Sequence, residues 1–221
     1  MGDEMNFEKA RFNMIEQQIR PWEVLNLDVL DLLSVIKREN FVPEMYRNQA
    51  FADLEVPLPH GQHMLSPKIE ARILQELAVR KHEQVLEIGA GSGYMAALLA
   101  ARAQRVITVE LYEDIAAFAQ QNLVSNAVSN VEVVVGDAAR GWPAAAPYDV
   151  IVVSGGLPIL PQGLLEQVKV GGRLSAFVGE APVMKAQIVT RLSETEFRIV
   201  ELFETYVAPL ENAQQPPRFK F

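Results

Sequence analysis

The amino-acid sequence predicts an α/β protein built on a doubly wound, mostly parallel sheet, with helices before the sheet and closing antiparallel strands after it. Four short, nearly continuous apolar runs have the composition of parallel strands buried on both faces; they span residues 85–88, 105–110, 131–135 and 149–153. Alanine- and leucine-rich segments at 94–103 and 114–124 separate these runs and suit crossover helices. A glycine-rich turn follows the first run directly, as is typical of the ligand-binding edge of such sheets.

Two helices and a long loop are predicted ahead of the sheet. From Phe7 to Ile19 apolar residues recur at helical spacing, and Pro21 ends the pattern because its ring cannot continue a helix interior. A second helix fits residues 27–36. Residues 51–67 include three prolines and one glycine but little periodicity, which predicts an ordered surface loop. A loop of this length suggests a functional role.

A third helix is predicted to begin directly after this loop. Ser66 followed by Pro67 has the pattern of an N-cap and a proline at the first helical position. The apolar residues 69, 73, 74 and 77 then recur at helical spacing, so we expect an amphipathic helix that ends near Arg80.

The C-terminal part of the chain alternates apolar and polar residues more clearly. The runs at 174–178, 187–191 and 197–207 predict closing strands, some of them antiparallel, and the tail 214–221 is expected to be loosely held. We expect residues 1–221 to form a single domain, with N-terminal helices and an active-site loop in 1–66, a cofactor-binding core in 67–180, and strands and tail in 181–221.

The composition narrows the classes of protein that the chain can represent. With no cysteine, neither a disulfide framework nor a cysteine-ligated metal is possible. A formal net charge of −8 disfavours a nucleic-acid partner, because non-specific affinity depends on clustered lysine and arginine. The N-terminus lacks the basic and apolar regions of a signal peptide, and no apolar stretch reaches membrane-spanning length. We therefore expect a cytoplasmic protein without a membrane partner.

The turn after the first predicted strand reads Gly-Ala-Gly-Ser-Gly-Tyr at residues 89–94. Glycine at such a turn lets the backbone approach a ligand closely, since side chains would occupy the ligand's space. A dinucleotide fingerprint spaces its glycines G-x-G-x-x-G, but here the third glycine arrives one residue early and Tyr94 holds the expected position. NAD is thus the poorer fit. Alone, the motif is also compatible with a tight strand-to-helix turn.

Acidic residues lie at the ends of three successive predicted strands. Glu110 ends the second strand, where a carboxylate can accept hydrogen bonds from both hydroxyls of a ribose, and Asp137 follows the third. Each has a simpler interpretation: Glu110 as a solvated strand end, Asp137 as a turn residue or helix N-cap. Together with Glu87 in the first strand they converge on the carboxyl edge of the sheet, which favours a nucleotide crevice.

These motifs resemble those of class I S-adenosylmethionine-dependent methyltransferases, whose sheet is Rossmann-like and whose first motif is an acidic residue, any residue, then Gly-x-Gly-x-Gly. The resemblance extends to the protein-L-isoaspartate O-methyltransferase family. Its main pieces are residues 85–94, Gly-Asp at 136–137, Gly-Trp at 141–142 and Ala-Pro-Tyr-Asp at 146–149. Supporting pieces are residues 41–43, 57–59, 61–62, 164–167, 171–174 and 209–210, so the match covers nearly the whole chain in order.

The resemblance implies a cofactor, a substrate and a set of site residues. The cofactor is S-adenosyl-L-methionine: the glycine turn would pass beneath its methionine part, Glu110 would hold the ribose, Asp137 would face the adenine amino group, and Ser154 would line the cleft near the sulfonium. The family's reaction methylates the α-carboxylate of L-isoaspartyl residues in damaged proteins, giving an ester that can cyclise and reopen as aspartate. The cofactor-binding residues expected on this basis are Glu87, Gly89, Ala90, Gly91, Ser92, Gly93, Tyr94, Glu110, Leu111, Gly136, Asp137, Ala138 and Ser154.

The loop before the third helix departs from the family pattern. The family has Gly-Gln-Thr-Ile-Ser-Gln-Pro, with its serine assigned to the active site, whereas residues 61–67 here read Gly-Gln-His-Met-Leu-Ser-Pro. Leu65 therefore replaces the serine and His63 the threonine. Ser66 and His63 are the candidate catalytic residues, although a serine before a helix-opening proline suits an N-cap better, and His60 and His63 also suit a solvent-facing position. Two histidines without a third ligand make a poor zinc site, so no metal is expected.

Three functions remain open from the sequence. The leading one is methylation of isoaspartyl residues. The second is a methyltransferase with the same cofactor but a different acceptor, which Leu65 motivates. The third is a cofactor-binding protein without turnover. All three keep the cofactor site, so residues 61–67 must discriminate among them, and the sequence does not give the oligomeric state.

Overall fold

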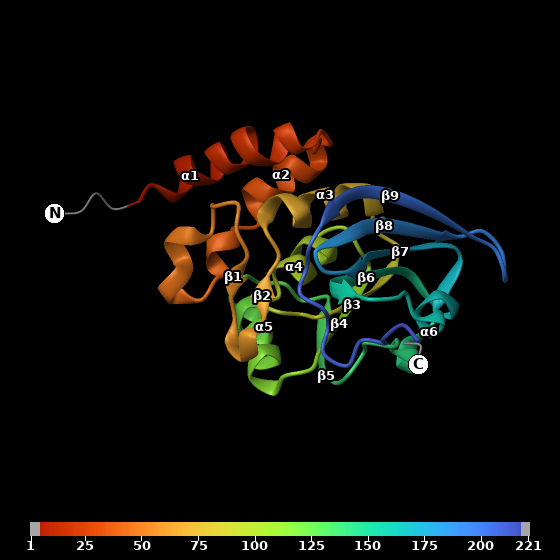
Figure 1. Ribbon diagram of the computed structural model, residues 1–221. Helices are drawn as coiled ribbons and strands as arrows, with labels where there is room; N and C mark the ends of the chain where they lie inside the picture. The colour runs from red at the N-terminus through yellow and green to blue at the C-terminus, as the bar shows by residue number, and fades with distance from the viewer. Residues whose placement is uncertain (1–4, 218–221) are drawn as a thin grey trace.

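A seven-stranded sheet forms the centre of the protein (Figure 1), and the computed structural model describes residues 5–217 of the chain. The strands of this sheet are β3 (Gln84–Ile88), β4 (Arg105–Glu110), β5 (Val131–Val135), β6 (Tyr148–Leu157), β7 (Val168–Glu180), β8 (Val183–Arg191) and β9 (Phe197–Thr205). Their order is β5-β4-β3-β6-β7-β8-β9. The first five are parallel, and β8 and β9 join them antiparallel. The predicted doubly wound sheet with closing antiparallel strands is confirmed.

Alternation along the central strands fills both faces of the sheet. Val85 of β3 and Val106 of β4 point into one hydrophobic cluster, whereas their neighbours Leu86 and Ile107 point into a second cluster on the opposite face. The expectation of burial on both faces is wrong for β5, because this strand forms an edge of the sheet and Val135 is exposed. A strand at the edge of a sheet pairs with a neighbouring strand on one side only, so more of its surface stays accessible to solvent.

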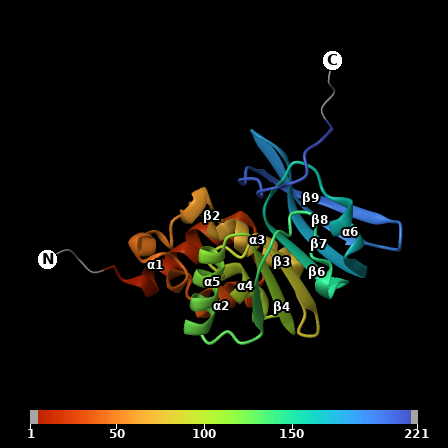
Figure 2. The ribbon, with the colours of Figure 1, turned by 90° about the horizontal axis from the view of Figure 1, so that it is seen from below.

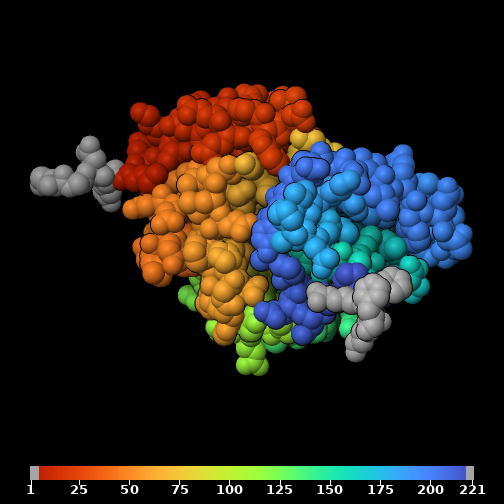
Figure 3. Space-filling view, in the orientation of Figure 1, coloured from red at the N-terminus to blue at the C-terminus, as the bar shows by residue number. Residues whose placement is uncertain are grey.

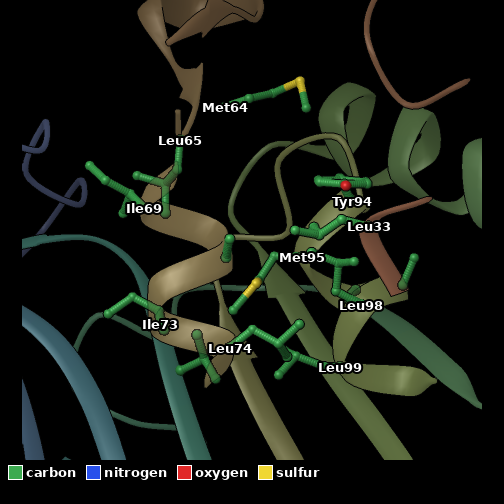
Figure 4. Close-up of a cluster of buried hydrophobic side chains, with 14 of the residues drawn as sticks. Leu33, Met64, Leu65, Ile69, Ile73, Leu74, Tyr94, Met95, Leu98 and Leu99 are labelled. Carbon is green, nitrogen blue, oxygen red and sulfur yellow. The ribbon is translucent and has the colours of Figure 1, made fainter. Parts of the chain in front are cut away.

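The helices gather mainly on one face of the sheet. Besides two N-terminal helices, they are α3 (Pro67–Leu77), α4 (Tyr94–Ala100), α5 (Glu113–Ser125) and the short α6 (Gln162–Glu166). Figure 4 shows Leu74 of α3 beside Met95 and Leu99 of α4, while Ile69 and Ile73 project from the other side of α3; all five belong to one hydrophobic cluster. Seen from below in Figure 2, the N-terminal helices, α4 and α5 lie on one side of the molecule, and β8 and β9 on the other.

The N-terminal helices follow the predicted pattern closely. Helix α1 (Phe7–Met14) continues through a π-helical turn at Ile15–Ile19 into a 3-10 turn at Arg20–Trp22. Glu23 then adopts a left-handed backbone conformation and ends the run, two residues after Pro21. Helix α2 (Leu27–Val35) begins at Asn26, whose side-chain oxygen accepts a hydrogen bond from the backbone N–H of Val29. A further 3-10 turn at Arg38–Asn40 follows.

The predicted surface loop contains a small hairpin. Strands β1 (Val56–Pro57) and β2 (His63–Met64) pair antiparallel, and a 3-10 turn at Pro59–Gly61 joins them. We call residues 51–65 the acceptor hairpin. Strands of two residues carry too little alternation to be recognised from sequence, so the loop prediction was wrong in this detail.

Helix α3 begins where predicted but not by the predicted means. Ser66 occupies the N-cap position, yet its hydroxyl makes no capping hydrogen bond; the oxygen is buried and has no partner among residues 5–217. The helix also ends at Leu77 rather than near Arg80, because Ala78 turns to a left-handed conformation and Arg173 donates to the carbonyls of Leu77 and Ala78.

The chain ends lie partly outside the described residues. The expectations for the first four residues, and for 218–221 in the tail, therefore have no structural counterpart here. Residues 214–217 form no helix or strand. Within residues 5–217, no helix combines the length and the apolar character that a bilayer-spanning segment needs.

Candidate active site

A cleft lies at the carboxyl edge of the parallel strands. Its floor comes from residues at or just after the ends of β3, β4 and β5 and from Ser154 and Gly155 within β6, as expected for an open α/β sheet. The acceptor hairpin forms one wall, and the C-terminal segment 207–211 forms another. In Figure 3 the acceptor hairpin and this C-terminal segment lie against each other on the face toward the viewer.

The glycine turn after β3 brings bare backbone to the cleft. Gly89 and Gly91 line it with φ angles of +90° and +53°, which favour glycine because other residues adopt them only with strain. Gly93 serves packing instead: it does not line the cleft, and a Cβ there would lie 3.1 Å from the carbonyl oxygen of Ala119 in α5. Gly89 and Gly91 therefore keep the cleft floor open, whereas Gly93 allows close packing of the start of α4 against α5.

Glu110 is held firmly at the end of β4. One carboxylate oxygen accepts a hydrogen bond from the backbone N–H of Gly91 at 3.0 Å, and the other accepts from Leu111 at 2.9 Å and Tyr112 at 3.2 Å. The side chain is mostly buried, so it is not a freely solvated strand end. The carboxylate ties the glycine turn to the next strand and lines the cleft.

Asp137 lies across the cleft floor at the end of β5. Oδ1 accepts from the backbone N–H of Ala139 at 3.0 Å, and Oδ2 accepts from the side-chain amide of Asn212 at 3.0 Å. Gly136 is required beside it, because an added Cβ would lie 2.8 Å from the ring of Trp142. Asp137 thus combines the predicted turn position with a place on the cleft wall.

Glu87 lies beneath the cleft rather than in its wall. It has no exposed surface, and its carboxyl oxygens accept hydrogen bonds from Thr108 at 2.7 Å and Ser154 at 3.1 Å. Burial raises the pKa of Glu87 to about 8, against the opposing effect of these two hydroxyls. Ser154 lines the cleft and links it to this buried carboxyl group.

The structure brings eight of the thirteen residues predicted to bind a cofactor to the cleft. They are Gly89, Gly91, Glu110, Leu111, Gly136, Asp137, Ala138 and Ser154. The other five lie below or behind the glycine turn; they are Glu87, Ala90, Ser92, Gly93 and Tyr94.

The two candidate catalytic residues differ in their placement. His63 lines the cleft from β2, and Leu65, which follows β2 and is only 8% exposed, also lines it. Ser66 does not line the cleft, since its hydroxyl is buried at the start of α3. An apolar side chain therefore occupies the wall position at which the family pattern has a hydroxyl.

His60 holds the tip of the acceptor hairpin against the start of α5. Its Nε2 lies 2.9 Å from a carboxylate oxygen of Asp114, and its ring stacks on Tyr112 with 4.1 Å between centroids. Although it is partly exposed, this histidine is not merely solvent-facing. Across the residues that the structure describes, no three histidine, aspartate or glutamate side chains gather closely enough to hold a metal ion.

Sequence reasoning missed two parts of the cleft wall. Glu55 and Gln62 line it from the acceptor hairpin, and residues 207–211 line it from the C-terminal segment. Burial raises the pKa of Glu55, while the neighbouring His63 opposes this shift. The signals for the first group were the length of the 51–67 loop and, for Gln62, the family loop pattern that begins at residues 61–62. For the second group the signal was the family resemblance at residues 209–210. Its place in the cleft wall did not follow from that resemblance, because the parallel bridge between Gly156 and Pro209 joins residues that are distant in sequence.

The ionisable side chains that line the cleft are mainly acidic. Of the lining residues in the described part of the chain, four carry carboxyl groups and none is a lysine or arginine; the four are Glu55, Glu110, Asp137 and Glu211. Carboxylates around a partly closed cleft produce a negative potential, which favours a ligand that carries positive charge.

The sheet order, the glycine turn and the acidic strand end define a class I methyltransferase fold. A sequence model of the family described as protein-L-isoaspartate(D-aspartate) O-methyltransferase (PCMT) matches residues 9–215. The chain belongs to this family.

Relatives and solved structures agree with this membership. The chain is 42% identical to a protein-L-isoaspartate O-methyltransferase from Methanoculleus marisnigri over 86% of both chains. It is 40% identical to protein-L-isoaspartate O-methyltransferase 1 of Rhodopseudomonas palustris, over 94% of this chain and 85% of that one. A Plasmodium falciparum structure described as a PCMT in complex with S-adenosyl-L-homocysteine superimposes with a TM-score of 0.79 at 18% identity, covering 94% of this chain and 99% of that chain. At this identity the structural likeness shows the fold.

Proposed function

We propose that this protein transfers a methyl group from S-adenosyl-L-methionine to the α-carboxylate of L-isoaspartyl residues in proteins. The observation that carries the proposal is the cleft itself, in which a glycine turn and the strand-end carboxylates Glu110 and Asp137 surround one space. Membership of the isoaspartyl methyltransferase family supports the choice of acceptor.

The cleft residues fit the cofactor chemically. Glu110 offers carboxylate oxygens to ribose hydroxyls, Asp137 offers one to the adenine amino group, and a Cβ on Gly89 would project toward Ser154 at 3.7 Å and narrow the floor. The four lining carboxyl groups suit a ligand with a sulfonium charge. When bound, the cofactor supplies an electrophilic methyl group on a positively charged sulfur.

The protein's own task is then to orient the acceptor. The α-carboxylate of an isoaspartyl residue is already ionised at neutral pH, so no general base has to remove a proton. Holding the carboxylate oxygen in line with the methyl group accounts for most of the rate that such a site can supply. His63 is the polar candidate for orienting the carboxylate, and the apolar Leu65 lines the cleft as well. Ser66 does not line the cleft, so we do not expect it to contact the acceptor.

A second candidate function is methylation of a different acceptor by the same cofactor site. Leu65 favours it, because an apolar side chain on the acceptor wall provides no hydrogen bond for a carboxylate. Losing one hydrogen bond to a charged group costs on the order of 1.5–3 kcal/mol, or roughly tenfold to hundredfold in rate. We therefore expect slow rather than absent isoaspartyl methylation.

Methyl transfer from labelled cofactor to an isoaspartyl peptide, with the aspartyl peptide of the same sequence as control, tests the proposal. Selective labelling of the isoaspartyl peptide supports it, and equal or absent labelling of both peptides contradicts it. Calorimetry with S-adenosylmethionine, S-adenosylhomocysteine and NAD tests the cofactor separately. Binding of NAD alone would refute the cofactor proposal.

We also propose that residues 1–221 act as one methyltransferase domain in the cytoplasm, with isoaspartyl proteins as partners. The continuous seven-stranded sheet supports the first part, and the absence of cysteine suits a reducing compartment.

A further inference from the structure

We propose that Arg38 is a positioning residue that clamps the two ends of the acceptor hairpin and thereby sets where Leu65 and His63 face the cleft. The inference rests on the proposed function for its kinetic readout. Arg38 lies outside the cleft and outside every motif singled out above.

The guanidinium of Arg38 reaches three segments at once. It has no exposed surface and lies in the 3-10 turn after α2. Nη1 donates to the backbone carbonyl of Ala50 at 3.1 Å, Nη2 to that of Leu65 at 2.6 Å, and Nε to the carboxylate of Glu70 at 3.1 Å. Its donors are thus distributed over the chain before the hairpin, the end of the hairpin and the first turn of α3.

These partners bracket the acceptor hairpin. Ala50 immediately precedes it and Leu65 is its last residue, so the two carbonyl bonds hold its ends on one rigid, planar group. Leu65 lines the cleft while its carbonyl is bound to Arg38. A shift of the guanidinium would therefore move a cleft-wall residue directly, and His63 two residues before it.

The glycine turn supports the guanidinium from the other side. Tyr94 ends that turn, and the guanidinium carbon lies 5.5 Å from the centre of its ring, within the range of a cation–π contact. Arg38 thereby links the acceptor wall to the element that forms the cofactor floor. The alternative is that the Arg38–Glu70 ion pair is only one more structural contact of the N-terminal helices.

The chain offers a matched control for this alternative. Arg11 and Glu39 form a second buried ion pair, each about 3% exposed, and Arg11 bonds only to Glu8 and Glu39 among the described residues. Neither member lines the cleft. Removing a partner from a buried pair destabilises a protein in either place, so only an effect on the hairpin distinguishes the two sites.

The test compares Arg38→Lys with Arg11→Lys in the full chain. Lysine keeps the charge but cannot span both carbonyls and Glu70 with one ammonium group. For Arg38→Lys we expect kcat/KM for the isoaspartyl peptide to fall by roughly tenfold or more, with the Kd of S-adenosylhomocysteine within about twofold of the parent, because each lost bond to a charged donor is substantial. Amide hydrogen exchange should accelerate in residues 56–64. Arg11→Lys should lower the Tm but leave the peptide kinetics and the hairpin exchange unchanged.

Equal effects of the two variants on kinetics and exchange would overturn the proposal. If Arg38→Lys fails to fold, Glu70→Gln provides the second variant. It weakens the bond that holds the Arg38 guanidinium in place, so amide exchange should accelerate in the hairpin and not elsewhere. Unchanged hairpin exchange in Glu70→Gln would then count against the clamp. Should the parent protein bind S-adenosylhomocysteine but methylate no peptide, the proposed function fails, and the exchange data still decide on the clamp.

Discussion

Glu87 combines a motif position with an unusual environment. Its carboxyl group is fully buried beneath the glycine turn, and both oxygens accept hydrogen bonds from hydroxyl groups. Burial, with smaller contributions from the neighbouring Glu70 and Glu110 carboxylates, keeps its pKa near 8 in spite of those bonds. The group is therefore largely protonated in the folded protein at neutral pH.

This pKa predicts how Glu87→Gln changes stability with pH. In the unfolded chain a glutamate loses its proton near pH 4.5, whereas the folded protein retains this one up to about pH 8. Between these values the unfolded state binds fewer protons, so the contribution of Glu87 to the free energy of unfolding falls as pH rises. The uncharged glutamine lacks this loss. The variant should therefore gain stability relative to the parent from pH 5 to 8, with no further change above.

Urea unfolding at several pH values measures this difference. Glu132→Gln is a control, because Glu132 is exposed on β5 and pairs with Arg105 at the sheet edge. A difference between Glu87→Gln and parent that stays constant from pH 5 to 8 would show that Glu87 is ionised in the folded protein.

Alanine substitutions of Glu110 and Asp137 should show whether each carboxylate only binds the cofactor or also stabilises the fold. Replacing either by alanine removes a carboxylate from the cleft, so we expect cofactor affinity to weaken by about 1–3 kcal/mol in each case. Glu110→Ala should also lower the Tm, because it frees the backbone N–H groups of Gly91, Leu111 and Tyr112. Asp137→Ala should lower it less, since it loses one backbone bond and one bond to Asn212.

Calorimetry with S-adenosylhomocysteine and thermal melts of both variants provide the two measurements. If a folded Asp137→Ala variant binds S-adenosylhomocysteine as tightly as the parent, this carboxylate only stabilises its turn and does not bind the cofactor. The same result for Glu110 would remove it from the cofactor site.

At the level of elements, the sequence predicted the sheet well because its signals are local. The strands at 85–88 and 105–110 are continuous apolar runs that can be recognised from the sequence. Because parallel strands place their carboxyl ends at one edge of the sheet, the sequence also predicts that Glu110 and Asp137 line the same cleft. The acceptor hairpin could not be predicted, because its two-residue strands are stabilised by tertiary contacts such as those of Arg38. Ser66 shows the limit most clearly. Its cap position was predicted correctly, but its hydroxyl bond was not.

The acceptor hairpin should be convertible toward the family pattern. Leu65→Ser combined with His63→Thr restores the two hydroxyl groups at cleft-lining positions. The Arg38 bond to residue 65 uses the backbone carbonyl, so it survives the substitution and the new serine should face the cleft. We expect isoaspartyl methylation to rise roughly tenfold or more, the value of one hydrogen bond to a charged group.

Steady-state kinetics on the isoaspartyl peptide, with Met64→Leu as a conservative hairpin control, check this expectation. Met64 lies between the two changed positions and does not line the main cleft. If the double variant methylates the isoaspartyl peptide no faster than the parent, Leu65 does not limit acceptance of the carboxylate.

At the scale of the whole molecule, charge should govern which isoaspartyl proteins are methylated fastest. The chain carries a net charge of −8, and the cleft is lined by acidic groups from both of its walls, Glu55 and Glu211 among them. Such a field repels acidic substrates during their approach and attracts basic ones, and it can change association rates by about tenfold or more.

Three isoaspartyl peptides that differ only in flanking glutamate, glutamine or lysine test this at saturating cofactor. At about 0.01 M salt, where the Debye length is about 30 Å, kcat/KM should rank lysine above glutamine above glutamate. At about 1 M salt that length shrinks to about 3 Å, so the three values should converge. The kcat values should differ little, because the flanking charges act on approach rather than on the transfer step. A ranking that persists unchanged at high salt would point to direct contacts with the flanking residues and refute a long-range effect of the acidic cleft.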